Sequence, residues 1–377
     1  MAIVTWDLLR ELAAFRAAKG CAVSFYLDLD PRVLPTAGEA ETRVNSLLAE
    51  VSRRTSSDEL THGQKEGLRA DAERLRRYYE QELVREGVRG LAVFAADLDN
   101  LWRPLPLADP VGDKVKVTEE LYLMPLVPLV GRGDGALVAV VGRELGEIFR
   151  LRGGALEPVA DRTEEQPGRH DQGGLSQSRY QRHIENLVLE HLRDVADELD
   201  RRVRRGDTDR VVVVASEETR AEFMDLLAKE TRDAVIGTTS AEAHAGPHEL
   251  LAAAVPFLDE SRVRFEQEVL GRWREEAGRN GRAATGWSAT LEAASDGRVD
   301  TLLYSDGVER AAWRCPVCGR LAAEPGTCPL DGTRLEEREE GLDLAVHHTL
   351  SHGGTILPVT SGPDLDPVEG IGALLRY

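Results

Sequence analysis

Residues 210–239 constrain the fold more than any other part of the sequence. A short apolar run, RVVVVAS, is followed by a helical stretch from about Glu218 to Lys229 and by a second apolar run, AVIGTT. Two apolar runs joined by a helix are typical of parallel strands with a crossover helix, so the pattern predicts a layered α/β domain. Because no Gly-rich fingerprint follows RVVVVAS, we expect neither a dinucleotide site nor a phosphate-binding loop there, and no nucleotide cofactor.

The chain is too long for one ordinary core, because its 377 residues exceed the roughly 100 to 200 residues of a typical domain. Strand and helix patterns alternate along its whole length. We therefore expect the α/β fold class, with three consecutive α/β domains. These are an N-terminal domain at 1–124 whose role the sequence does not reveal, a central domain at 125–256, and a C-terminal domain at 257–377 that carries a small zinc-knuckle insertion at 313–335.

Periodicity predicts the main elements of the first two domains. In the N-terminal domain, the strands AVSFYLDLD and GLAVFAAD flank a charged helical stretch from about Glu39 to Gly87, which is interrupted near Thr55 to Gly63. In the central domain, GALVAVVGRELGEIFRLRGGALEPV predicts two strands with glycine turns. The polar stretch DRTEEQPGRHDQGGLSQS predicts a mobile loop, and apolar residues at helical spacing from Ile184 to Val203 predict a long helix after it.

The C-terminal domain shows the same alternation. We expect a long charged helix from about Phe257, then a helix and a strand in GWSATLEAASDGRVDTLLYS, and finally a helix, LDLAVHHTL, leading through two glycines into a strand. The cysteine cluster lies between these two helix and strand pairs, as an insertion.

Composition narrows the classes of function. The 42% hydrophobic and 30% charged residues are typical of a soluble globular protein. A formal charge of −19 argues against a protein that coats nucleic acid, so any contact with RNA must be local. No apolar run approaches the roughly 18 residues that a membrane span needs, and the first residues lack the features of a signal peptide. We expect a cytoplasmic protein without a membrane partner.

Three of the four cysteines lie close together, which favours a metal site over disulfides. A CPVC turn is followed by a CPLD turn that repeats it, with an aspartate where a fourth cysteine would stand. Thiolates and an aspartate oxygen are all legitimate zinc ligands, and a ring of protein ligands closes the coordination sphere. The sequence therefore predicts a structural zinc site made of Cys315, Cys318, Cys328 and Asp331.

Two alternatives to this ligand set stay open. One of His347, His348 and His352 could supply the fourth ligand, or the metal could be lost while the turns survive. The remaining cysteine, Cys21, stands alone before an apolar run and is most simply a small buried hydrophobe.

The candidate active site is the stretch HDQGGLSQSRYQRH, residues 170–183. Gly173 and Gly174 permit close backbone approach, and the amide of Gln177 can orient a water molecule. Backbone N–H groups can stabilise an oxyanion, and arginine binds phosphate with bidentate geometry. Such a device needs most of its surroundings from a partner such as ribosomal RNA. The candidate RNA-binding residues are Arg169, Arg179, Arg182 and His183.

GGLSQSRYQR resembles the GGQ loop and the following helix of the archaeal and eukaryotic class-1 peptide-chain release factors. It is closer still to the GGSQ-type loop of their relative, the peptidyl-tRNA hydrolase of eukaryotic ribosome quality control. The closing residues GIGALLRY resemble the end of the same factors. The resemblance covers roughly residues 125–377 and does not include the codon-reading domain. The chain looks like a bacterial member of this superfamily.

The resemblance implies hydrolysis of the peptidyl-tRNA ester in the peptidyl-transferase centre, in rescue or quality control of stalled ribosomes. Gly173 and Gly174 would be the loop glycines and Gln177 the catalytic glutamine. Its partners would be the large ribosomal subunit, rRNA and peptidyl-tRNA, and a monomer is the default for a factor that enters the ribosome. If RYQR is aligned without gaps to the family's RFAR segment, Leu175 takes the place of the glutamine and Gln177 lies two residues later.

Other functions stay open. A non-catalytic stress or hibernation factor could occupy the A site and reach the same centre. A related enzyme could cleave the tRNA end instead of the ester. A zinc-ribbon adaptor could bind another protein through its acidic surface.

Overall fold

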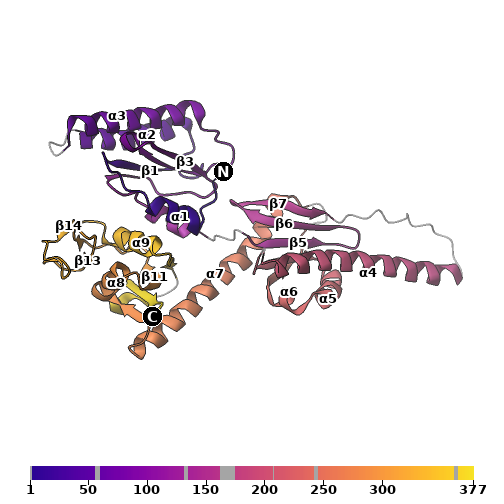
Figure 1. Cartoon of the computed structure of the whole chain (residues 1–377). Coiled ribbons are helices and arrows are strands. Elements are labelled where there is room, and N and C mark those ends of the chain that lie inside the picture. The colour runs from indigo at the N-terminus through magenta and orange to yellow at the C-terminus, as the bar shows by residue number, and fades with distance from the viewer. Residues whose placement is uncertain are drawn as a thin grey trace. The chain divides into compact units, whose positions relative to one another are not determined.

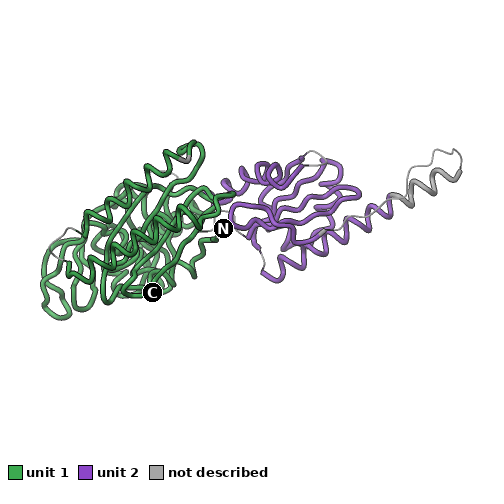
Figure 2. Tube along the Cα trace, turned by 90° about the horizontal axis from the view of Figure 1, so that it is seen from above, with its two compact units in different colours: residues 1–130, 265–377 green, residues 131–264 purple. Residues whose placement is uncertain are grey.

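The computed structural model describes two compact units, residues 1–130 with 265–377 (unit 1) and residues 131–264 (unit 2), shown in Figure 2. The description omits residues 1, 56–59, 131–134, 162–174, 207, 242–244 and 361–363, and covers only the backbone of residues 37, 161 and 175–184. Both units combine sheets and helices, so the predicted α/β class is confirmed. No helix in the described parts of the chain is long and apolar enough to cross a membrane.

The N-terminal part of unit 1 is an antiparallel sheet with the order β3-β2-β1-β4. Its strands are β1 (Ala22–Asp28), β2 (Gly90–Ala96), β3 (Leu101–Leu107) and β4 (Lys114–Thr118), and its α-helices are α1 (Trp6–Ala13), α2 (Ala37–Thr55) and α3 (His62–Arg77). Figure 1 shows α2 and α3 on one face of this sheet. A Thr61–Gln64 capping box begins α3, which explains the predicted interruption of the helical stretch.

Alternation along β1 gives the sheet two apolar faces. Val23, Phe25 and Leu27 pack in one cluster with α2 and α3, whereas Tyr26 belongs to a second cluster on the opposite face. The sequence did not predict β3 and β4. In β3 the sequence LWRPLPL contains two prolines, which an edge strand such as β3 accommodates but a periodicity analysis rejects.

The C-terminal part of unit 1 contains a mixed sheet with the order β10-β16-β11-β15. Its strands are β10 (Ala283–Thr285), β11 (Val299–Ser305), β15 (Thr355–Val359) and β16 (Ile371–Leu375). Helices α8 (Gly286–Ser295) and α9 (Gly341–Ser351) contribute to the core on one face. On the other face, Leu270 and Trp273 of helix α7 (Pro247–Gly278) pack against Leu303 and Leu374. The cysteine insertion forms its own small sheet of β12 (Ala312–Arg314), β13 (Leu321–Ala322) and β14 (Glu336–Arg338).

The two parts of unit 1 share a continuous apolar core and several buried polar contacts. Asp343 Oδ1 accepts a hydrogen bond from the Leu123 backbone N–H at 3.1 Å. His347 Nε2 is hydrogen-bonded to the Leu121 carbonyl, and Arg314 lies 2.8 Å from Glu120 in a mostly buried ion pair. The N-terminal and C-terminal parts share this core, yet each also has its own sheet. The predicted domain boundaries at 124/125 and 256/257 therefore stay predictions.

Asp343 and His348 give unit 1 two opposing dependences on pH. Burial raises the pKa of Asp343 from 3.8 to about 6, so the folded state binds more protons than the unfolded chain between these values. Its contribution to the free energy of unfolding is therefore fully present below pH 3.8 and is lost as the pH rises through 6. Burial lowers the pKa of His348 from 6.5 to about 4, which makes the free energy of unfolding rise with pH across a similar window.

We expect Asp343→Asn to remove the Asp343 contribution to the pH dependence of stability and to leave the His348 contribution. The amide keeps an acceptor for Leu123, so the fold is retained. Between pH 4 and 6, the variant should gain stability relative to wild type by up to about 3 kcal/mol, as urea unfolding at several pH values measures. Parallel stability curves for wild type and variant would contradict the assignment.

Unit 2 is built on a five-stranded sheet with the order β7-β6-β5-β8-β9. Its strands are β5 (Leu137–Val141), β6 (Gly146–Arg152), β7 (Ala155–Asp161), β8 (Val211–Ala215) and β9 (Val235–Thr239). The parallel pairing of β8 with both β5 and β9 confirms the prediction made from residues 210–239. The segment 135–159 was predicted to hold two strands and holds β5, β6 and part of β7, because Gly153 and Gly154 adopt left-handed conformations that close a second hairpin.

Helices cover both faces of this sheet. Apolar residues of α4 (Leu175–Arg204) and α5 (Glu217–Leu226) pack on one face, and α6 (Lys229–Asp233) follows them. Leu250, Ala254 and Leu258 of α7 pack on the other face. The prediction that the last long helix begins near Phe257 was wrong, because this apolar stripe continues the helix back to Pro247.

Candidate functional site

The cysteine insertion is two copies of one turn. In the first copy, Gly319 N–H donates to the Cys315 carbonyl at 3.0 Å and Cys315 N–H donates to Arg320 O at 2.9 Å. In the second, Gly332 N–H donates to the Cys328 carbonyl at 2.9 Å, and Cys328 N–H donates to Thr333 O at 2.7 Å. The backbone thus places Asp331 in the second turn where Cys318 stands in the first.

A glycine closes each turn for the same reason. Gly319 has a φ of 79° and Gly332 a φ of 73°, a left-handed conformation that favours glycine. The sequence analysis assigned no role to these glycines. The signal was present, since a glycine directly follows the last residue of both CPVC and CPLD.

The turns bring four donor atoms together. Asp331 Oδ2 lies 3.4 Å from Cys315 Sγ, and the Sγ atoms of Cys318 and Cys328 are 3.5 Å apart. All four ligand atoms lie within 4.8 Å of one another. Ligands at about 2.3 Å from a tetrahedral ion would be roughly 3.8 Å apart, so the cluster could hold one metal ion.

Electrostatics favour the metal-binding form of two donors, Asp331 and Cys328. At Cys318 a backbone hydrogen bond with Arg320 lowers the pKa, but desolvation and the neighbouring donor side chains outweigh it and raise the pKa to about 11. Hydrogen bonds from Thr333, above all from its backbone N–H, lower the pKa of Asp331 to about 2. Although burial opposes it, the backbone N–H groups of Leu330 and Asp331 lower the pKa of the Cys328 thiol. Deprotonated carboxylate and thiolate are the forms in which these side chains bind metal.

The histidine alternatives for the fourth ligand are not supported. Among the described residues, the cluster that could hold a metal ion contains Asp331 and no histidine. His347 is buried against Leu121, and His352 Nδ1 is hydrogen-bonded to the His348 carbonyl at 2.8 Å. The structure therefore brings together the predicted set of three cysteines and Asp331, and not a set with histidine as the fourth ligand.

The second candidate site is the segment before and at the start of α4. Arg169, Gly173 and Gly174 lie outside the described residues. Helix α4 begins at Leu175, earlier than the sequence analysis predicted, so its first turn includes Gln177. Leucine, glutamine and arginine are good helix formers, which extends the helix beyond its apolar stripe. The backbones of Arg179, Arg182 and His183 also lie in α4, and their side chains are outside the description.

The packed part of α4 gives this segment a defined base. Val188, Leu192, Val195 and Leu199 lie in the core of unit 2, and Val188 is the first buried residue of the helix in its described portion. At 1.5 Å per residue, Leu175 lies about 20 Å along the helix from Val188. The candidate residues are thus carried by a helix that the sheet anchors at a distance.

The central segment matches a known family model. Residues 122–257 match the family model described as bacterial archaeo-eukaryotic release factor family 10. This range contains Gly173, Gly174 and Gln177. The GGLSQSRYQR stretch, which resembles the loop and helix of release factors, is therefore inside the matched range.

Two curated relatives carry the same description, peptide chain release factor subunit 1. The protein of Methanopyrus kandleri is 30% identical over 53% of this chain and 50% of its own length. That of Archaeoglobus fulgidus is 27% identical over 63% of this chain and 61% of its own length. The chain thus spans about half to three fifths of the curated relatives it matches.

Solved structures include a model of ribosome-bound archaeal Pelota and ABCE1, with 16% identity, coverage of 100% of this chain and 95% of that chain, and a TM-score of 0.44. The family match and the release factor relatives lead to one assignment. These findings support membership of the chain in the archaeal and eukaryotic peptide-chain release factor superfamily, and its residues 122–257 match the bacterial family 10 model.

Proposed function

We propose that this protein binds the large ribosomal subunit and promotes hydrolysis of the peptidyl-tRNA ester, in rescue or quality control of stalled ribosomes. The observation that carries the proposal is the family match over residues 122–257, the part of the chain that contains Gln177. The protein would act as a cytoplasmic monomer, with rRNA and peptidyl-tRNA as its partners.

In this proposal, Gln177 orients the attacking water through its amide, which both donates and accepts hydrogen bonds. Gly173 and Gly174 let the backbone approach the ester closely. Gln177 lies at the N-terminal end of the described part of α4, and the N–H groups and dipole of a helix N-terminus favour a developing oxyanion. The ribosome would supply the substrate and the remaining electrostatics.

Local arginines would make the RNA contact. The net charge of −19 argues against a general attraction to RNA, so binding would depend on a few groups near the start of α4. Arg169, Arg179, Arg182 and His183 are the proposed groups, since arginine binds phosphate through charge-assisted hydrogen bonds. These contacts would fix the register of the helix on rRNA.

One observation favours a second candidate, a non-catalytic hibernation factor that occupies the A site. In the ungapped alignment to the release factors, Leu175 stands where the glutamine is expected, and α4 already begins at Leu175. A glutamine displaced by two residues along a helix points in another direction, and a shift of about 1 Å can already cost 10²-fold in rate. Ribosome binding would survive this displacement, whereas hydrolysis would not.

The experiment that tests the proposal measures binding and release in the same sample. Purified protein is incubated with large subunits that carry labelled peptidyl-tRNA, and bound factor, free peptide and the tRNA 3′ end are quantified. The proposed contact with rRNA is supported if the Arg179→Gln, Arg182→Gln double variant no longer co-sediments with the large subunit. The control, Arg193→Gln on the exposed side of α4, should still co-sediment. Absence of co-sedimentation for wild type overturns both candidates and favours a protein-binding adaptor.

We also propose zinc as the ion of the Cys315, Cys318, Cys328 and Asp331 cluster. Three thiolates select a soft or borderline ion, and four protein donors fill a tetrahedral sphere. The ion would be structural, because no coordination position is left for water. The geometry and the lowered pKa of Asp331 support this choice.

Asp331→Cys should complete a four-thiolate site and tighten metal binding. In protein loaded with Co²⁺ as a spectroscopic probe, we expect the ligand-to-metal charge-transfer absorption in the near ultraviolet to increase by about a third, as a fourth thiolate joins three. Asp331→Ala should leave this absorption at the wild-type level and weaken affinity. An unchanged spectrum and affinity in both variants would show that Asp331 is not a ligand.

A further inference from the structure

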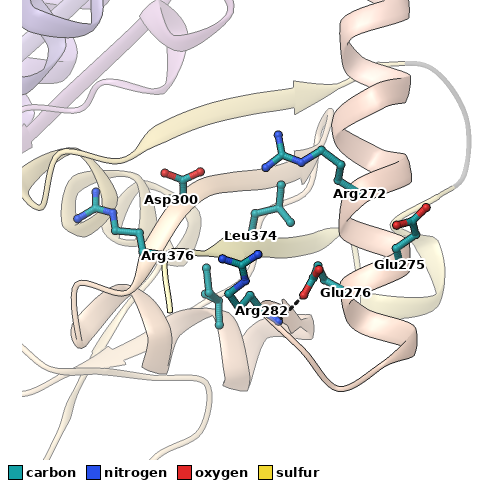
Figure 3. Close-up of a pocket in the computed structure, with 8 residues that line it drawn as sticks. Arg272, Glu275, Glu276, Arg282, Asp300, Leu374 and Arg376 are labelled. Carbon is teal, nitrogen blue, oxygen red and sulfur yellow. Dashed lines mark hydrogen bonds between the residues drawn. The ribbon is translucent and has the colours of Figure 1, made fainter.

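A cavity of about 350 Å³ lies in the C-terminal part of unit 1, remote in sequence from the Gln177 segment. It is lined by residues of the last turns of α7, the segment leading into β10, the start of β11 and the end of β16. Its volume is at the lower end of the range for small-molecule sites. Figure 3 shows Arg272 and Arg282 on either side of Leu374, with Asp300 and Arg376 toward the other end.

The three arginines of this cavity are uncommitted. Among the described residues, the guanidinium groups of Arg272, Arg282 and Arg376 make no hydrogen bond or ion pair, whereas neighbouring arginines do. Arg274 on the same helix, for example, lies 3.2 Å from Asp364. In a chain with 66 acidic and 47 basic residues, three unpaired arginines at one cavity indicate a site for an external anion.

The nearby acidic groups are largely engaged elsewhere. Glu275 pairs with Arg279 at 3.1 Å, and Glu276 Oε2 accepts the Arg282 backbone N–H at 2.9 Å. Only the Asp300 carboxylate is without a described partner among the acids that line the cavity. A hydrogen bond from a neutral backbone N–H leaves Glu276 charged, so the three guanidinium groups against the carboxylates of Asp300 and Glu276 leave one positive charge, which favours an anion such as a phosphate.

The wall of the cavity is held in place by the backbone. Gly281 N–H donates to the Glu276 carbonyl at 2.8 Å and Leu375 N–H donates to the Arg282 carbonyl at 3.0 Å, so the turn after α7 is fixed to β16. A Cβ at Gly281 would lie 2.5 Å from Glu276 Oε2, so the Glu276 side chain packs directly against this turn. Arg272 extends from the end of α7 and Arg282 from this turn, on either side of Leu374, and a guanidinium group can bind a phosphate through two parallel hydrogen bonds.

We propose that this cavity binds a phosphorylated sugar, as carried by a nucleotide or by the 5′ end of an RNA chain. Arg272 and Arg282 would hold the phosphate, Leu374 would contact the apolar face of the sugar, and Asp300 would accept a hydrogen bond from a sugar hydroxyl. Arg376 would add positive charge at that end. No Gly-rich loop is involved, and the residues lie far apart in the sequence, which is why motif analysis gave no sign of the site. The proposal does not rest on the role of Gln177.

The test is isothermal titration of the full-length protein at low salt with inorganic phosphate, ribose 5-phosphate, a nucleoside monophosphate, and a short RNA with and without a 5′-phosphate. We expect ribose 5-phosphate to bind more tightly than inorganic phosphate. An Arg272→Gln, Arg282→Gln double variant should bind at least about tenfold more weakly. The matched control, Arg264→Gln, changes an exposed arginine of the same helix that pairs with Glu260, and should bind as wild type does.

Asp300→Ala should remove the preference for ribose 5-phosphate, because the acceptor for the sugar hydroxyl is lost, while inorganic phosphate binds as tightly or more tightly. Binding of the mononucleotide alone identifies a free nucleotide as the source, and binding of RNA only with its 5′-phosphate identifies an RNA end. Both results support the proposal. Absence of binding for all probes, or equal binding by wild type and the double variant, overturns it. All three substituted side chains are exposed, so unfolding midpoints should stay at the wild-type value.

Discussion

Gln177→Ala should reduce the rate of peptide release by about 10²- to 10³-fold while ribosome binding is unchanged. Removing one preorganised hydrogen-bonding group from a water-excluded site costs a factor of this size, because the group acts in the transition state and not in binding. The truncation removes no charge, so contacts with rRNA phosphates should persist. Single-turnover release at saturating factor measures the rate directly.

Gln181→Ala is the matched control, because Gln181 lies in the same helical stretch and is the unassigned position of the RYQR segment. It should release peptide at the wild-type rate. If Leu175 instead occupies the catalytic position, Gln177→Ala will release as wild type does. Leu175→Gln would then raise the rate. Equal losses for Gln177→Ala and Gln181→Ala would indicate damage to the helix and contradict a specific role of Gln177.

Cys315→Ser should abolish stoichiometric metal binding and lower the stability of unit 1 by several kcal/mol. Structural zinc contributes on the order of 10 kcal/mol to the folding of small zinc peptides, and Cys315 is fully buried. The loss should extend beyond the insertion, because the preceding residue, Arg314, pairs with Glu120 of the N-terminal part at 2.8 Å. Metal analysis and urea unfolding report the two effects separately.

Cys21→Ser is the control for this prediction. Cys21 is half-buried and lies outside the metal-binding cluster. The variant should therefore keep one equivalent of metal and lose little stability. Full metal content in Cys315→Ser, or equal destabilisation by the two substitutions, would contradict a structural metal at the knuckle.

The sequence predicted the parts of the fold in which an apolar pattern is continuous. RVVVVAS and AVIGTT became β8 and β9, and the capped break near Thr61 separated α2 from α3. Strand β3 was missed because its prolines hide the alternation, and β4 was missed because it is short and charged and its partner, β1, lies far away in the chain. The start of α7 was missed because Pro256 reads as a helix breaker, although the helix continues through it.

The candidate sites differ in how much local sequence could reveal. The knuckle was predictable, since its ligands come from two short turns with the same spacing. The three-arginine cavity was not, because Arg272, Arg282 and Arg376 meet only after α7, β10 and β16 have assembled. The N- and C-terminal parts pack into one unit through buried contacts such as the hydrogen bond between Asp343 and Leu123. These residues lie far apart in the chain, so no local sequence pattern predicts the contact.

The most direct test of the proposed function is the fate of peptidyl-tRNA on the large subunit after wild-type protein is added. We predict that labelled peptide is released and that the tRNA keeps an intact 3′ end, as ester hydrolysis requires. Stable binding without release would contradict catalysis and leave a factor that occupies the A site. Peptide that remains attached to a shortened tRNA fragment would also contradict ester hydrolysis, and would identify cleavage of the tRNA as the reaction.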